Sequence, residues 1–434
     1  MTTSSNRSYD ASLALYDEAL TLIPGGTQTT SKRAAAFAWG AYPIYLVSGQ
    51  GSHVTDIDGN TYIDLVSGLG PVSLGYAHPA VDAAIREQLA SGIISSLPSP
   101  LEVEVARLLV EAIPCAEQVR FFKGGGEATA AAARVARRFT GRSLILNCGY
   151  RGWPDVWTAA SNDGGVPEAF AESIASLPFN DREAVEALIV AHPGEIAAIA
   201  IDVQATMPEP GYLAWLRDLA HEIGAVLIFD EIVTGFRLAR GGAQEYFGVT
   251  PDLAVFAKGI ANGMPLAAVA GRAEVMAAMT DATISITYGG EALSLAAAKA
   301  VLTVYRDEPV VETLHARGAR LRAGLDAAAE AAGVPFATHG FDPMTAMRFD
   351  GLDTGTDYDA WTFLLQEMAE RGVLLRRGGL NFVTYSHTET DVDAIVAAAS
   401  EVFAALRPLL DAGTIRSRLR TRDIAATPAF RTFS

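Results

Sequence analysis

The segment YLAWLRDLAHEIGAVLIFDEI, residues 212–232, indicates the class of fold. Apolar side chains recur at helical spacing over Tyr212–Ile223, and Gly224 ends that pattern. The apolar run Ala225–Asp230 that follows is typical of a buried strand. A helix that leads directly into a buried strand is a repeating unit of α/β proteins.

Similar patterns lie on both sides of this segment. Short apolar runs bounded by turn residues predict further strands, and an Ala- and Arg-rich stretch predicts another helix. We therefore expect an α/β domain with a doubly wound, mostly parallel sheet between helices, whose ligands bind outside the carboxyl ends of the strands. The expected strands are Ser143–Asn147, Ala198–Asp202, Leu253–Ala257 and Ala267–Gly271, and the expected helix is Glu127–Thr140.

The two flanks of the chain have a different pattern. Near the N-terminus, Ser52–Asp56 and Thr61–Leu65 predict a hairpin whose turn contains Gly59. Towards the C-terminus, long helical patterns mixed with short strands predict a smaller α+β domain. Its expected helices are Val310–Ala332, Asp357–Arg371 and Glu389–Leu406, and its expected strands lie near Thr345–Phe349 and Asn381–Tyr385.

These patterns predict four segments along the chain. Arginines at alternate positions near the C-terminus favour a solvated or subunit-clasping extension there; they are Arg416, Arg418, Arg420 and Arg422. The expected segments are 1–70, which joins the small domain, 71–305, the large domain, 306–406, the small domain, and 407–434, the tail.

Composition excludes several classes of protein. The 434 residues are 50% hydrophobic and 19% charged, so two or three folded domains are expected rather than a disordered chain. The net charge of −17 argues against nucleic acids and anionic membranes as partners. The chain has two cysteines, Cys115 and Cys148, no signal peptide and no transmembrane run, so we expect a cytoplasmic protein.

A glycine-rich loop precedes the expected helix Glu127–Thr140. The sequence FFKGGGEAT, residues 121–129, places three glycines before the helix. Glycines allow backbone N–H groups to approach an anion closely, and a helix N-terminus adds its positive dipole end. The pattern is typical of a phosphate cradle, although an ordinary turn would also explain it.

Two polar residues stand where apolar strands end. Asp230 follows one strand, and a carboxylate there needs a cationic partner, which a metal ion or the protonated ring nitrogen of a cofactor would supply. No His or Asp cluster at ligand spacing lies beside it, so no metal site is expected. Lys258 follows another strand, where a desolvated amine can form a Schiff base with a carbonyl; the alternative is a surface lysine in a turn.

Two further loops complete the candidate site. Tyr150, after the strand Ser143–Asn147, offers an aromatic face to a planar ring, and Thr287 offers a hydroxyl beside glycines. A lysine, a carboxylate, a stacking aromatic ring and a phosphate cup are together what pyridoxal phosphate (PLP) requires. The residues therefore indicate this cofactor.

Several sequence blocks, in the same order, resemble the class III, fold type I aminotransferases, in the branch that contains glutamate-1-semialdehyde aminomutase. The resemblance extends over roughly residues 23–406. The matching blocks are IPGG at 23–26, VTDIDGNTYID at 54–64, LGYAHP at 74–79, FDEIVTGFR at 229–237, KGIANG at 258–263 and SHTETD at 386–391.

This resemblance implies a fold type I PLP-transferase with a homodimeric active unit and a role for each matched residue. Lys258 would carry the cofactor and move protons, and Asp230 would pair with the pyridinium nitrogen. The remaining implied contacts are Ile232 and Tyr150 on the two ring faces, Gly125 and Gly126 on the phosphate, and Thr287 on the phosphate of the neighbouring subunit's cofactor.

Some positions depart from the family's pattern. The residues on both sides of the central loop glycine usually carry hydroxyls, but here they are Gly124 and Gly126. Lys123 stands where a small polar residue is usual, and its charge could compensate for the missing hydroxyls. The usual Tyr-His-Gly contains Arg151 in place of His, and the usual Glu-Pro reads Asp202 and Val.

The loop 287–295 favours one of the reactions that this family performs. It resembles the branch that acts on sugars, cell-envelope and natural-product precursors, whereas the aminomutase usually reads Ser-Gly-Asn-Pro there. We expect amino transfer from an amino acid donor to a ketone or aldehyde of a polar acceptor. The open alternatives are an aminomutase, an epimerase or racemase, and more remotely a non-catalytic binding protein. Arg376 and Arg377 could bind a substrate carboxylate, although a solvated basic pair would also explain them.

Overall fold

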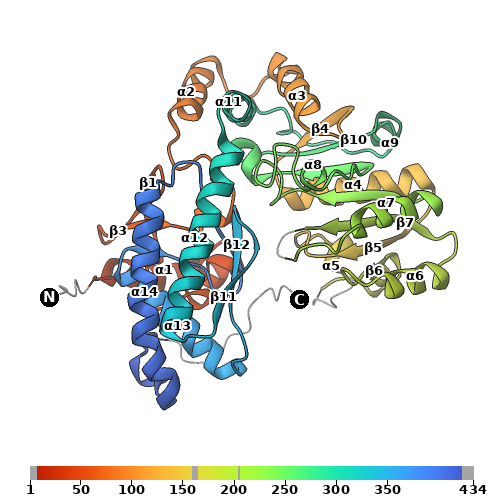
Figure 1. The fold of residues 1–434 in the computed structure, drawn as a ribbon. Coiled ribbons are helices and arrows are strands. Elements are labelled where there is room, and N and C mark those ends of the chain that lie inside the picture. Colours follow the sequence, from red (N-terminus) through yellow and green to blue (C-terminus); the bar gives the residue numbers. More distant parts are fainter. Residues whose placement is uncertain (1–6, 159–164, 204–205, 423–434) are drawn as a thin grey trace. The chain divides into compact units, whose positions relative to one another are not determined.

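The computed structural model divides the chain into two compact units, each described here by itself (Figure 1). The sheet unit comprises residues 70–73 and 79–311, and the flanking unit comprises residues 1–69, 74–78 and 312–434. The structure describes all residues except 1–6, 159–164, 204–205 and 423–434.

A seven-stranded, mostly parallel sheet is the centre of the sheet unit, as the sequence predicts. Strand β10 runs antiparallel to both of its neighbours, and the other paired strands are parallel. The local pattern does not predict β4 and β6, because β4 has charged Arg120 in its middle and β6 has three residues. In spatial order the strands are β4 (Gln118–Phe122), β10 (Ala267–Gly271), β9 (Leu253–Phe256), β8 (Val226–Asp230), β7 (Ile196–Asp202), β5 (Leu144–Cys148) and β6 (Ile174–Ser176).

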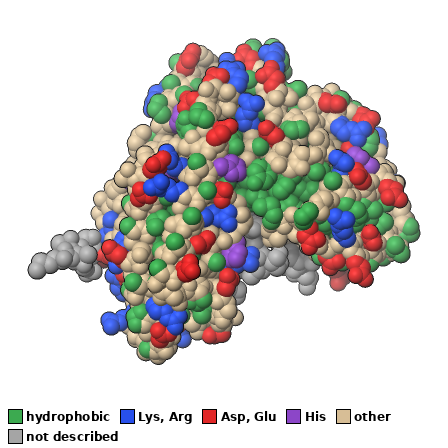
Figure 2. Space-filling model, viewed as in Figure 1, with side chains coloured by type: hydrophobic (Ala, Val, Ile, Leu, Met, Phe, Trp, Pro, Cys, Tyr) green, Lys and Arg blue, Asp and Glu red, His purple; other side chains and the backbone are tan. Residues whose placement is uncertain are grey.

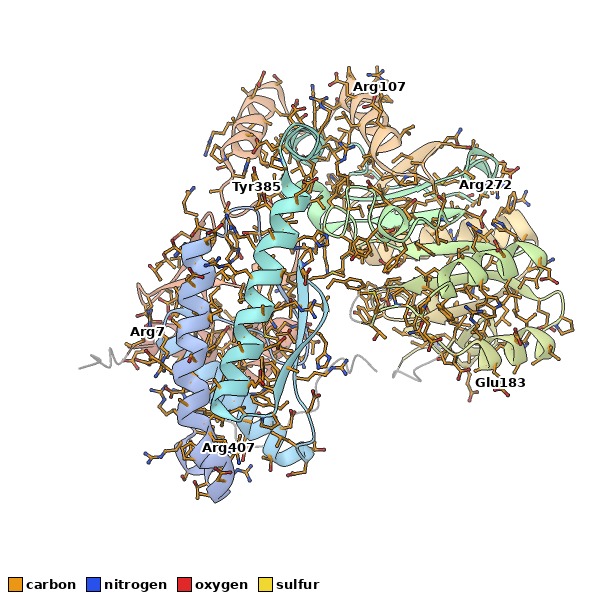
Figure 3. All side chains as sticks on the ribbon, in the orientation of Figure 1. Arg7, Arg107, Glu183, Arg272, Tyr385 and Arg407 are labelled. Carbon is orange, nitrogen blue, oxygen red and sulfur yellow. The ribbon has the colours of Figure 1, made fainter. Side chains whose placement is uncertain are left out.

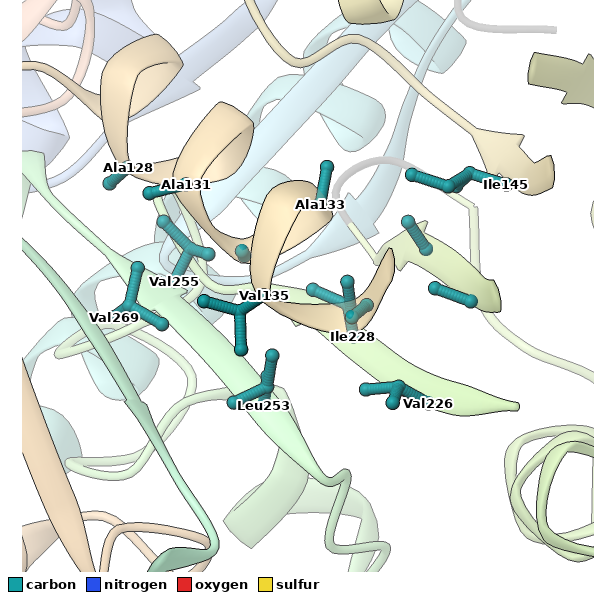
Figure 4. Packing of buried hydrophobic residues seen from close by; sticks show 14 of the residues in the cluster. Ala128, Ala131, Ala133, Val135, Ile145, Val226, Ile228, Leu253, Val255 and Val269 are labelled. Carbon is teal, nitrogen blue, oxygen red and sulfur yellow. The ribbon is translucent and has the colours of Figure 1, made fainter. Parts of the chain in front are cut away.

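Helix α4 (Gly125–Thr140) packs its small side chains against this sheet (Figure 4). Its alanines and Val135 share a buried cluster with Ile228 of β8, Val255 of β9 and Val269 of β10. Since alanine projects little from the helix, α4 lies close to the strands. The start of α4 is thereby held beside the ends of the central strands.

The other helices of the sheet unit connect its strands and surround the sheet. Helix α11 contacts α2 and α3, and ten of its sixteen residues are buried, so it belongs to the core of this unit. The helices are α2 (Pro79–Ser91), α3 (Pro100–Ala112), α5 (Asp155–Thr158), α6 (Arg182–Ala191), α7 (Tyr212–Glu222), α8 (Ala243–Phe247), α9 (Ala273–Met276), α10 (Ala278–Asp281) and α11 (Ala292–Asp307).

The amino ends of β8 and β9 are joined through one buried carboxylate. Asp252, which precedes β9, accepts a hydrogen bond from the backbone N–H of Leu227 at 2.8 Å and pairs with Arg272 at 2.7 Å. Figure 3 labels Arg272 in the sheet unit. A buried carboxylate is stable when it is paired and hydrogen-bonded in this way. The opposite, carboxyl ends of the same strands remain available for a ligand.

Among its described residues, the flanking unit contains two small sheets and four long helices. One sheet has the order β1–β2–β3–β13 and the other β11–β12–β14. The strands are β1 (Leu46–Gln50), β2 (His53–Asp56), β3 (Thr61–Asp64), β11 (Phe336–Phe341), β12 (Met344–Phe349), β13 (Val373–Leu374) and β14 (Leu380–Phe382), and the helices are α1 (Asp10–Leu22), α12 (Val310–Ala332), α13 (Thr354–Glu370) and α14 (Glu389–Ala412).

The sequence predicts a solvated or subunit-clasping extension at the C-terminus, and the four arginines of this segment are exposed as far as residue 422. Helix α14 continues past Leu406 to Ala412, and Ile415 is buried. Arg420 pairs with Glu367 of α13 at 3.1 Å, and the backbone N–H of Arg422 donates to the carbonyl of Trp39. These contacts fix the segment to its own unit, and the remainder of the expected tail lies outside the described residues.

The surface carries charges of both signs. Figure 2 shows acidic and basic side chains interspersed over the viewed face, so the net charge of −17 does not gather into one patch there. Within the described parts of the chain, every helix is too short or too polar to cross a membrane.

Candidate active site

The carboxyl edge of the sheet brings the two predicted catalytic residues to neighbouring strands. Asp230 is the last residue of β8 and pairs in register with Val255 of β9. Lys258 follows Val255 by three residues, at the point where β9 ends. On the other side of β8, Asp230 pairs with Asp202, the last residue of β7. Parallel strands thus place an amine and two carboxylates at one edge.

Lys258 has an unusual backbone conformation. Its φ is +47°, in the left-handed region that L-residues with a side chain rarely adopt. Such a conformation costs on the order of 1–3 kcal/mol and persists only where the surroundings enforce it. Ala257 and Gly259 on either side are buried, while Lys258 itself is half-buried. The fold therefore holds this lysine in one orientation at the rim of the core.

Asp230 is buried, with 4% of its surface exposed, and its carboxylate is held on both oxygens. Oδ1 accepts a hydrogen bond from the backbone N–H of Ile232 at 3.0 Å. Oδ2 accepts from Nη1 of Arg151, also at 3.0 Å. A carboxylate oxygen has two lone-pair sites, so each oxygen can accept one more bond.

The start of α4 has the properties of an anion site. The residue before the helix is Gly124, which has no side chain to cap the first turn. The first N–H groups of a helix have no partner within it, so those of Gly125 and Gly126 can be offered to a phosphate. A Cβ on Gly125 would lie 2.6 Å from Cδ1 of Ile232, so the Ile232 side chain would have to move to accept it. A Cβ on Gly124 or Gly126 would meet nothing closer than 3.4 Å.

Lys123 is already paired. Its Nζ lies 2.9 Å from Oε2 of Glu291, and both side chains are largely buried. Glu291 also accepts bonds from the backbone N–H groups of Leu293 and Ser294 and so caps α11. Burial raises the pKa of Glu291, but the bonds from Ser294 and Lys123 bring it below its usual value. The lysine thus joins the glycine loop to α11, and this pairing argues against a free charge that compensates for the missing hydroxyls.

Tyr150 and Arg151 lie on a loop between β5 and α5 that packs on the start of α4. Gly149 and Gly152 have φ near +95°, and the residue Tyr150 is 39% exposed. Oγ1 of Thr129, on α4, lies 3.1 Å from the carbonyl of Arg151. The sequence predicts no role for Arg151, because a single arginine in a loop carries no signal of its distant partner.

Three predicted residues remain. Thr287 is exposed, in the turn that precedes α11. Arg376 and Arg377 belong to the flanking unit. The Arg377 guanidinium lies 4.1 Å from the centre of the Tyr358 ring, and burial lowers its pKa, which favours a packing role. Arg376 donates to Oγ of Ser31 at 3.3 Å.

Comparison with known proteins decides the family. The sequence profile described as Aminotransferase class-III matches residues 36–403. The chain belongs to the class-III aminotransferase family. A relative from Desulforapulum autotrophicum, named glutamate-1-semialdehyde 2,1-aminomutase, is 36% identical over 423 residues, which are 91% of this chain and 98% of the relative. A 3-aminobutyryl-CoA aminotransferase from Cloacimonas acidaminovorans is 33% identical, with 92% and 98% covered.

Solved structures agree with this family. The PLP internal aldimine form of the FumI protein from Sphingopyxis sp. MTA144 matches with a TM-score of 0.87 and 27% identity, over 92% of this chain and 97% of that one. The expected fold type I architecture and PLP cofactor are thereby confirmed for this class-III aminotransferase. The chain is an enzyme of the PLP-dependent aminotransferase type, with an amino donor and a carbonyl acceptor as substrates.

The residues at the carboxyl edge of the sheet fit PLP. A phosphate fits the N–H groups of Gly125 and Gly126 at the start of α4, where Gly124 offers no capping side chain. The buried Asp230 carboxylate fits a protonated ring nitrogen, and the Lys258 amine fits the carbonyl of PLP. All of these groups belong to the sheet unit.

Proposed function

We propose that this enzyme moves an amino group from an amino acid donor to the ketone or aldehyde of a polar acceptor, such as a sugar-like or natural-product precursor. Bound PLP supplies an electron sink for the bonds of the amino-bearing carbon. Lys258 would bind the cofactor and move a proton to and from the substrate α-carbon. Asp230 would hold the proton on the ring nitrogen.

The neighbouring residues would position the cofactor within this scheme. Ile232 and Tyr150 would pack against the two faces of the ring, and the N–H groups of Gly125 and Gly126 would bind the phosphate. The observation that carries the proposal is the juxtaposition of a strained, half-buried Lys258 and a buried Asp230 at the ends of adjacent parallel strands. Strained backbone and buried charge together are typical of catalytic sites.

The turn before α11 supports transamination over an intramolecular reaction. Where the aminomutase usually reads Ser-Gly-Asn-Pro, this chain has the sequence GGEA at 289–292. Glu291 in this sequence caps α11 and forms an ion pair with Lys123, and the neutral Asn of Ser-Gly-Asn-Pro would not form that ion pair. The second candidate is an aminomutase, which the relatives of that name at 36% identity favour.

A single-turnover experiment separates the two reactions. The purified holoenzyme is mixed with one amino donor, such as glutamate or alanine, and no acceptor. Transamination predicts loss of the visible cofactor band and release of one keto acid per site. An enzyme that releases no keto acid with any donor, yet exchanges the α-proton of a single amino substrate with solvent, would be an isomerase, and the proposal would be wrong.

We further propose a cytoplasmic homodimer with shared active sites. Thr287 is exposed in the sheet unit and so is accessible to a second subunit. Both cysteines are free thiols, which is typical of proteins in a reducing compartment.

A further inference from the structure

Asp230 forms an ion pair with a permanently charged residue of the protein itself, Arg151. The side chains of Arg151 and Asp230 are 1% and 3% exposed, and Nη1 lies 3.0 Å from Oδ2. A buried ion pair of this kind is stable only when its geometry is good and the remaining hydrogen-bonding groups are satisfied. The surroundings of Arg151 meet that condition.

The Arg151 guanidinium is fixed by its own segment. Nε donates to Oδ1 of Asn147 at 2.7 Å, and Nη2 donates to the carbonyl of Cys148. Its central carbon lies 5.6 Å from the centre of the Trp157 ring. The charge is therefore held at one place relative to the end of β8, and its contact with Asp230 is not an exposed, adjustable ion pair.

We propose that Arg151 is a positioning residue that orients Asp230 and sets how tightly the ring nitrogen of PLP holds its proton. This inference rests on the pairing of Asp230 with that nitrogen in the proposed function. A guanidinium stays charged at every pH at which the protein is folded, whereas the histidine that is usual at this position in the family can be neutral.

The fixed charge has a predictable effect on the bound cofactor. A cation close to the carboxylate offsets part of its negative charge, and that negative charge is what stabilises a protonated ring nitrogen. The ring nitrogen of this enzyme therefore loses its proton at a lower pH than it would beside Asp230 alone. Arg151 achieves this without contact with the reacting atoms.

The test measures the protonation of the ring nitrogen directly. Holoenzyme is prepared with PLP labelled with ¹⁵N in the ring, and the nitrogen shift is followed against pH by NMR. Arg151→Gln removes the charge and is expected to raise the pH of deprotonation by about one unit or more, while Arg151→Lys keeps the charge and is expected to stay near the unsubstituted enzyme. Equal titration in the Gln variant and the unsubstituted enzyme would overturn the inference.

A matched control removes another guanidinium with a structural role only. Arg142 donates to the carbonyls of Ile196 and Ile223, near the amino ends of the strands. Arg142→Gln is expected to lower stability and to leave the nitrogen titration unchanged; if it shifts the titration as much as Arg151→Gln does, the effect is not specific and the inference fails.

The variant Asp230→Asn separates a failure of this inference from a failure of the proposed function on which it rests. If the Asn variant leaves the nitrogen shift unchanged, Asp230 does not contact the ring and the proposed site is wrong. If the Asn variant changes the shift and the Arg151 variants do not, only the role of Arg151 is wrong.

Discussion

At the scale of single residues, Lys258 shows how backbone and chemistry act together. A lysine that follows the end of a strand lies at the sheet edge where ligands bind, and its amine can form a Schiff base with a carbonyl there. The left-handed backbone directs that amine and is maintained by the buried residues on either side. The strain is tolerated because the core of the sheet unit is extensive and well packed.

Lys258→Ala is expected to abolish the visible absorption band of the bound cofactor and to lower turnover at least about 10²-fold, since both covalent attachment and proton transfer are lost. The measurements are the absorbance spectrum of the purified variant and its rate with an amino donor. The thermal midpoint of the variant, measured beside that of the original enzyme, checks that both proteins are folded.

Lys299→Ala is the control for Lys258→Ala. Lys299 forms an exposed pair with Glu104 and lies on α11. Its removal should leave both the band and the rate intact. An unchanged band in Lys258→Ala, or a band lost in Lys123→Ala alone, would contradict the assignment of Lys258.

At the scale of elements, the three glycines between β4 and α4 differ in the space around them. Gly125→Ala is expected to weaken PLP binding at least fivefold, because the new Cβ would displace Ile232, which we place against the ring. Gly124→Ala adds the same methyl group into open space and should bind PLP as before. Equilibrium titration of the two apoenzymes with PLP checks the difference; equal affinities would refute the steric argument.

Gly126→Thr tests whether the missing hydroxyl can be restored. A Cβ there makes only ordinary contacts, with Pro154 Cδ at 3.4 Å, and the backbone is helical. One added hydrogen bond to the phosphate should tighten PLP binding by about 1 kcal/mol. Retention of PLP on dialysis measures this effect, and unchanged or weaker retention would count against the placement of the phosphate.

At the scale of the whole molecule, His387 predicts how stability depends on pH. The ring is buried, Nδ1 accepts a bond from the backbone N–H of Thr384 at 2.9 Å, and burial lowers its pKa to about 4. The unfolded chain binds a proton below about pH 6.5 and the folded chain only below about 4, so stability falls as the pH falls between these values.

The expected contribution of His387 is a loss of about 2 kcal/mol in the free energy of unfolding between pH 7 and pH 5. His387→Asn keeps an acceptor for Thr384 without a titrating ring, so its stability should change less over that interval. Urea unfolding of both proteins at the two pH values gives the comparison. The same pH dependence in both would show that this histidine does not titrate as stated.

Mixing two inactive variants tests the shared active site. If Thr287 acts on the neighbouring subunit's cofactor, a dimer of one Lys258→Ala and one Thr287→Ala subunit has one site with both changes and one with neither. Activity after subunit exchange should exceed the sum of the separate variants. No gain, with exchange verified by mass spectrometry, would place Thr287 in its own subunit's site.

Local pattern in the sequence determined the α/β class, the main strands, the glycine loop and the candidates Lys258 and Asp230. Each of these depends on a short run: an apolar strand, a turn residue and a polar residue at the strand's end, all within a few positions. That information is local because hydrogen bonding and side-chain spacing in strands and helices are local.

Only the tertiary structure decided which distant groups meet. Arg151 and Asp230 are 79 positions apart, and Lys123 and Glu291 are 168 apart, so no spacing rule connects them. The antiparallel direction of β10 and the packing of residues 413–422 on the flanking unit were likewise invisible in the sequence. The physical reason is the same in each case. A contact between distant segments depends on how whole elements pack, and that packing exists only in the folded chain.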